Sequence, residues 1–163
     1  MLQEIVPIGV RPSTLSGLSE HMIVGHYETH YGNAVQALNE VRRELAALDA
    51  AASPSRLGRL KGEELSLMSS VALHELYFAN LGGFRRAGPN SGLGRPDWHE
   101  VPEEFAQEIA AGFATTAQWR REFTAMAQSL AGGSGWVALT WSRRHKRFSS
   151  QIATDHAQAA IDA

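Results

Sequence analysis

The chain has no cysteine, and this absence removes several chemistries at once. Disulfides, thiolate metal ligands and cysteine nucleophiles are excluded, so any metal must be held by imidazole and carboxylate groups. The charge also lacks a dominant sign, because 15 basic and 17 acidic residues give a formal net charge of -2. Spread along the sequence, these charges give no electrostatic footprint for nucleic acid or an anionic membrane, and we therefore expect neither partner.

Long apolar runs are missing from the start of the sequence as well. Met1 to Pro12 hold neither a charged leader followed by an apolar run nor the ~20 apolar residues of a membrane span. We therefore expect a cytoplasmic, or already processed, protein. At 163 residues and 44% hydrophobic composition, the chain suits one well-filled core better than two separate domains.

The first half predicts an antiparallel helical hairpin. Its first helix is expected to start after an N-cap at Ser19 and to continue to Leu48, because apolar residues recur at helical spacing over this stretch. Small residues over 49–54 indicate a linker. The second helix is expected to begin after Gly62 and to end at Gly82.

The second half predicts a loop, two helices and a β-hairpin. Thr115 and Gln118 form a capping-box pattern, and 142–146 makes a basic turn between the strands. We expect an α+β fold with a small antiparallel sheet, composed of an arm and helical hairpin over 1–83 and an α/β half over 84–163. The elements of the second half are expected at 84–102 (loop), 103–113 and 119–130 (helices), and 136–141 and 147–153 (strands).

Three histidines carry the candidate chemistry. His26 and His30 are four residues apart, so they share one face of the first helix, and His74 lies on the inward stripe of the second. A helical hairpin can bring His74 against His26. Buried imidazoles need polar partners or a metal for their nitrogens, so a shared metal and ordinary core histidines are both open interpretations.

Three motifs carry a resemblance to a known family. Residues 26–39, H-Y-E-T-H-Y-G-N-A-V-Q-A-L-N, resemble the first-helix motif of the iron/manganese superoxide dismutases. Residues 74–81, H-E-L-Y-F-A-N-L, are similar to that family's second-helix motif, and 133–136, G-S-G-W, resemble the turn that enters its sheet. The resemblance extends from about Leu18 to the end of the chain.

The resemblance implies one iron or manganese held by three histidines, one aspartate and a solvent molecule. That site oxidises one superoxide to dioxygen and reduces the next to hydrogen peroxide. By resemblance, His26 and His74 are metal ligands and His30 lines the substrate funnel as a catalytic residue. Tyr77 and Trp136 would wall the site, although ordinary core packing is the alternative that accounts for most of their buried area. A homodimer is also implied.

The sequence departs from the family pattern at several positions. The family takes its other two ligands from a D-x-x-x-H stretch after the last strand, and the 163 residues contain no such stretch, so the expected fold is C-terminally incomplete. Asp155 and His156 are adjacent and would point apart on a strand, so we do not expect them to substitute. Ala34 stands where the family has a gateway tyrosine, and Gly132 or Ser70 where it has a solvent-bonding glutamine.

Three interpretations follow from these departures. The chain is a shortened dismutase with a two-histidine site, or a non-catalytic relative that uses the fold as a binding or structural module. In the third interpretation the two histidines hold zinc or iron weakly, completed by water, a second chain or Asp155. Two protein ligands are fewer than the three or four of usual zinc sites.

Overall fold

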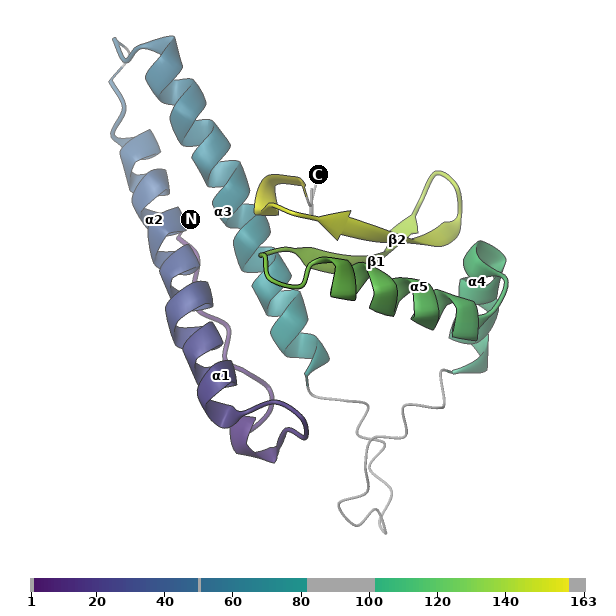
Figure 1. Ribbon diagram of the computed structural model, residues 1–163. Helices are drawn as coiled ribbons and strands as arrows, with labels where there is room; N and C mark the ends of the chain where they lie inside the picture. The colour runs from purple at the N-terminus through teal and green to yellow at the C-terminus, as the bar shows by residue number, and fades with distance from the viewer. Residues whose placement is uncertain (1, 50, 82–101, 159–163) are drawn as a thin grey trace. The chain divides into compact units, whose positions relative to one another are not determined.

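A computed structural model describes residues 2–49, 51–81 and 102–158 (Figure 1). These residues form two compact units, one of residues 2–49 and 51–81 and the other of residues 102–158. The first unit is helical, and the second combines helices with a two-stranded antiparallel sheet. The α+β prediction is therefore confirmed. The predicted loop at 84–102 lies almost wholly outside the described residues, and the division into 1–83 and 84–163 stays a prediction.

The first predicted helix is continuous but changes its hydrogen-bond pattern in the middle. An α-helix, α1 (Glu20–Gly25), is capped by Ser19, whose hydroxyl accepts the Met22 amide. A π-helical segment, η2 (His26–Tyr31), follows and passes directly into α2 (Gly32–Ala46). The Gly32 amide donates to the Tyr27 carbonyl, five residues earlier. Single π-helical turns inside α-helices occur frequently at functional sites, and this one carries His26 and His30.

The second helix, α3, spans Pro54–Asn80 and lies antiparallel to α2 (Figure 1). The predicted start after Gly62 is therefore wrong. Ser53 caps the helix by accepting the Arg56 amide, and Pro54 occupies the first turn, where its missing N–H costs nothing. The end predicted at Gly82 agrees with the last helical residue to within two positions.

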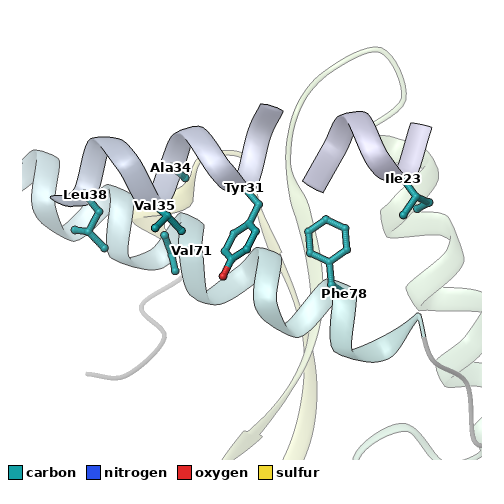
Figure 2. Packing of buried hydrophobic residues seen from close by; sticks show 7 residues of the cluster. All are labelled: Ile23, Tyr31, Ala34, Val35, Leu38, Val71 and Phe78. Carbon is teal, nitrogen blue, oxygen red and sulfur yellow. The ribbon is translucent and has the colours of Figure 1, made fainter. Parts of the chain in front are cut away.

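The core of the first unit lies between α3 and the run α1–η2–α2. Figure 2 shows Phe78 and Val71 of α3 directed toward side chains of the opposing run. Ile23 and Tyr31 have no exposed surface at all. The arrangement buries one apolar stripe of each helix, which is how an amphipathic hairpin gains most of its stability. The buried cluster comprises Ile23, Tyr31, Ala34, Val35, Leu38, Val71 and Phe78.

The second unit packs two helices against a β-hairpin. Thr115 caps α5 by accepting the Gln118 amide, as the capping pattern predicts. Gly112 of α4 lies so close to β2 that a Cβ built on it would stand 2.6 Å from the Phe148 carbonyl oxygen. The strands pair in register, with Trp141 opposite Phe148. The elements are α4 (Glu103–Phe113), α5 (Thr116–Ser129), β1 (Trp136–Ser142) and β2 (Arg147–Ala153).

Among the described residues, no helix combines the length and the apolar character that crossing a membrane requires.

Two glycines inside α3 give a prediction about stability. Gly58→Ala and Gly62→Ala are each expected to raise the free energy of unfolding by about 0.4–1 kcal/mol, because alanine restricts the unfolded chain and suits a helix better. A Cβ at either position meets no atom within 4 Å. Urea denaturation measures the change. Gly17→Ala is the matched control, because its added Cβ also meets nothing but its φ of +83° disfavours alanine, so that variant should be less stable.

Candidate metal centre

The hairpin brings the predicted histidines together. The ring centroids of His26 and His74 are 5.0 Å apart and the two planes are nearly perpendicular, at 86°. His30 also contacts His26, with ring centroids 5.4 Å apart and an angle of 89°. His26 therefore contacts an exposed histidine of its own segment and a buried histidine of α3.

His74 is held in one tautomer by the backbone. Its side chain is buried, with 4% of the residue exposed, and its Nδ1 lies 2.7 Å from the Ser70 carbonyl oxygen. A carbonyl oxygen only accepts, so Nδ1 carries the proton and donates it. The lone pair of the neutral ring then lies on Nε2. Metal-binding histidines are commonly oriented in this way, through a hydrogen bond from the nitrogen that does not bind the metal.

Ser70, Ala34 and Gly132 are positions at which the sequence departs from the family pattern, and of these Ser70 contacts His74, chiefly through its backbone carbonyl. Its hydroxyl is 3.4 Å from His74 Nδ1, a longer contact than the 2.7 Å from the carbonyl, so the carbonyl is the main partner. Ala34 is part of the buried core, and Gly132 occupies a turn with a φ of +86°.

His26 is partly buried and contacts both of the other rings. Burial, with a smaller contribution from the charge of His30, lowers the pKa of His26 from its ordinary value. Both effects favour the neutral imidazole, which is the form that binds metals. Imidazole nitrogens on facing helices suit iron or zinc, and equally copper or nickel, whereas manganese is implied only by the family resemblance.

Aromatic rings surround the pair on the side of α3. Tyr77 lies with its ring centroid 5.1 Å from that of His26, and burial raises the pKa of its hydroxyl. Phe78 lies 5.4 Å from His26 and stacks on His74 at 6.4 Å. Sequence reasoning selected Tyr77 and missed Phe78, although its spacing of four residues from His74 places both on one helix face. The roles of Tyr77 and His30 in a reaction stay predictions.

A hydrogen-bond network attaches the N-terminal arm to this side of the hairpin. The Tyr31 hydroxyl donates to Glu75 Oε1 at 2.9 Å and accepts the Val6 amide at 2.8 Å. Gln3 Nε2 also donates to Glu75 Oε1, at 3.2 Å. Burial and the neighbouring Glu75 carboxylate raise the pKa of Tyr31 to about 12. The network connects the arm to η2 and to the residue that follows His74.

The Tyr31 hydroxyl gives a second stability prediction. Tyr31→Phe is expected to lower the free energy of unfolding by about 1–3 kcal/mol, because it leaves the Val6 amide and the Glu75 carboxylate each without this partner. Thermal and urea denaturation measure the loss. Tyr27→Phe removes a single, more exposed hydrogen bond to the Val6 carbonyl, and should cost less than Tyr31→Phe. An equal cost for both variants would contradict the role of the buried network.

Trp136, Asp155 and His156 lie in the second unit. Trp136 Nε1 donates to His156 Nδ1 at 3.0 Å. Asp155 Oδ1 accepts the Ala157 amide at 2.6 Å, so its carboxylate stabilises the turn before a short 3₁₀ segment. The expectation that the Asp155–His156 pair does not substitute for the family's ligands stays a prediction. The proposed place of Trp136 beside the metal stays a prediction.

The described residues form no group of three or more histidine, cysteine, aspartate or glutamate side chains that could hold a metal. The roles of His26 and His74 as metal ligands stay predictions.

The amino-acid sequence is similar to those of known superoxide dismutases. Residues 101–163 match the model of the iron/manganese superoxide dismutases, C-terminal domain. The chain is 42% identical over 158 residues to the iron superoxide dismutase of Cupriavidus metallidurans, which covers 96% of this chain and 73% of that protein. It is 33% identical over 90 residues to the iron enzyme of Aquifex aeolicus, covering 52% of this chain and 42% of that one. It is 23% identical over 144 residues to manganese superoxide dismutase 1 of Halobacterium salinarum, covering 88% of this chain and 64% of that one. The chain belongs to the iron/manganese superoxide dismutase family.

Proposed function

We propose that His26 and His74 are two ligands of one iron or manganese ion, and that this site converts superoxide to dioxygen and hydrogen peroxide. The observation that carries the proposal is the facing pair itself, with ring centroids 5.0 Å apart and His74 Nδ1 2.7 Å from the Ser70 carbonyl oxygen. Relatives named as iron and manganese superoxide dismutases support the same choice of metals.

The residues of the hairpin have distinct tasks in this proposal. When bound, the metal would supply the one-electron steps, so that two superoxide ions and two protons give one dioxygen and one hydrogen peroxide. His26 and His74 would hold it through imidazole nitrogens. The Ser70 carbonyl fixes the orientation of the His74 ring, and Phe78 and Tyr77 limit the access of water to the pair. His30, exposed beside His26, would line the approach of the anionic substrate.

The rest of the ligand set is the open part of the proposal. The family resemblance implies one more histidine and an aspartate from a D-x-x-x-H stretch, which the 163 residues do not contain. Metal analysis therefore tests whether other groups join His26 and His74 as ligands of one ion. A homodimer also belongs to this proposal, and light scattering tests it by the mass of the metal-loaded protein.

The experiment is metal analysis paired with an activity assay on the same purified sample. Protein produced with added iron, or separately with added manganese, is analysed by mass spectrometry and then assayed for superoxide consumption. We expect close to one iron or manganese per chain, together with activity that scales with metal content. A folded chain that holds neither metal and consumes no superoxide would overturn the proposal and support the binding or structural module. Bound zinc without activity would support the weak-site interpretation.

A further inference from the structure

The turn between β1 and β2 concentrates positive charge. Arg143, Arg144, Lys146 and Arg147 lie within five residues, and no acidic residue occurs between Glu122 and Asp155. Removing these four from the 15 basic residues leaves 11 against 17 acidic ones, so the rest of the chain carries a formal charge of -6. The overall charge of -2 is therefore the sum of a charge of +4 in the turn and -6 in the rest of the chain, and the charges are not spread evenly along the sequence as expected.

All four basic side chains are exposed, and His145 between them is exposed too. Among the described residues, none of the ion pairs involves these four side chains. The turn has a defined shape, because Ser142 Oγ accepts the His145 amide and Lys146 adopts a φ of 48°, which is uncommon for a residue other than glycine. The turn thus presents its cations on an ordered hairpin, whose end is visible in Figure 1 as the loop joining β1 and β2.

An exposed aromatic residue stands directly beside the cations. Trp141 is 41% exposed and lies opposite Phe148 in the ladder, next to the pair formed by Ser142 and Arg147. Its ring centroid is 4.9 Å from that of Phe148, at an angle of 66°. Phe148 in turn contacts Phe105 of α4, which supports the indole from within the unit. An indole held this way offers surface on which an unpaired base can stack.

We propose that this basic hairpin end, Trp141 to Arg147, binds single-stranded nucleic acid without sequence specificity. Three of its four cations are arginines, whose planar groups match phosphate oxygens in bidentate geometry. Stacking on Trp141 requires a base that is not already stacked in a duplex, and this favours a single strand. Trp141 is the one apolar side chain of Trp141 to Arg147, and a membrane-binding segment needs a larger apolar face, so an anionic membrane is the poorer match.

Fluorescence anisotropy tests the proposal with a labelled 20-nucleotide oligothymidine and the full chain. We expect binding at 50 mM salt that weakens with a log–log slope of about -2.8, from about 0.7 per phosphate for four cations. That slope corresponds to about a 50-fold loss of affinity between 50 and 200 mM salt. The absence of binding at 50 mM salt would overturn the proposal.

Two charge-matched variants locate the binding surface. One replaces the four turn cations, and the other replaces Arg11, Arg43, Arg56 and Arg59, all exposed in the first unit. Each set is changed to glutamine, so both variants carry a net charge of -6 by the same count. The turn variant is expected to lose at least about tenfold in affinity and most of the salt slope, whereas the other keeps most of both. Equal losses in both variants would overturn the placement at the turn.

Stacking and competing partners are tested separately. Trp141→Leu is expected to weaken oligothymidine binding by at least about fivefold, and Trp141→Phe to restore part of the loss, with folding of both checked by circular dichroism. A 20-base-pair duplex of mixed sequence is expected to bind more weakly than the single strand. Equal or tighter duplex binding, or binding only to vesicles that contain phosphatidylserine, would overturn the assignment of the partner.

Discussion

Replacing His74 with alanine is expected to lower metal affinity by at least about 100-fold and to abolish superoxide consumption. Loss of a group that merely orients a metal ligand costs 10–100-fold in such sites, so loss of a proposed ligand should cost at least the upper end of this range. His26→Ala should have the same effect. The measurements are metal content after dialysis and activity per chain, with the free energy of unfolding determined in parallel.

Two control variants separate this effect from general damage. His21→Ala changes an exposed histidine of α1 and should retain both metal and activity. Ser70→Ala removes the hydroxyl at 3.4 Å from His74 Nδ1 but keeps the carbonyl at 2.7 Å, so metal affinity should change by less than about threefold. Retention of metal by His74→Ala would show that the ion binds elsewhere in the protein.

Gly112→Ala is expected to cost the second unit about 2–3 kcal/mol of unfolding free energy, the upper part of the range for overpacked sites. The added Cβ would stand 2.6 Å from the Phe148 carbonyl oxygen. That oxygen belongs to a strand paired in register with β1, so it cannot move without disturbing the ladder. A fall in melting temperature of about 4–8 °C per kcal/mol is typical for a unit of 60–100 residues.

Gly58→Ala is the control for Gly112→Ala, because it makes the same chemical change inside a helix where the added Cβ meets no atom within 4 Å. Because one variant is expected to destabilise and the other to stabilise, the pair distinguishes steric conflict from helix propensity. Differential scanning calorimetry measures both. A Gly112→Ala protein as stable as the unchanged chain would mean that α4 and β2 separate easily, contrary to the close packing described above.

Local signals in the sequence predicted local structure well. Ser19 and Thr115 cap their helices as expected, because a cap depends on a hydroxyl and an amide two or three residues away. The strands at 136–141 and 147–153 agree with β1 and β2 to within one residue, since β-prone residues border a polar turn. The predicted start of α3 was wrong because Gly58 and Gly62 lower helix propensity and moved the expected start to after Gly62. Pro54 was the signal for the true start, because proline is favoured in the first turn of a helix.

Features that depend on packing could not be predicted in the same way. The meeting of His26 and His74 was predicted because helical periodicity places both on inward faces. The stack of Phe78 on His74 and the bond from Tyr31 to Glu75 depend on how the two helices are rotated against each other. Periodicity leaves that rotation undetermined. The π-helical turn likewise has no composition that distinguishes it from an α-helix.

The π-helical turn has a consequence for how the family's first helix can vary in length. An α-helix turns about 100° per residue, so each residue gained or lost rotates everything on one side relative to the other. Deleting one residue within 26–31 would convert the wide turn into a regular α-helix, so α1 would stay in phase with α2 and Ile23 would stay in the core. The wide turn thus absorbs a residue that a regular helix could not accommodate while keeping both ends in phase. Loss of one residue between His26 and Tyr31 should therefore be tolerated among homologous sequences, whereas loss of one residue inside α2 should be far rarer.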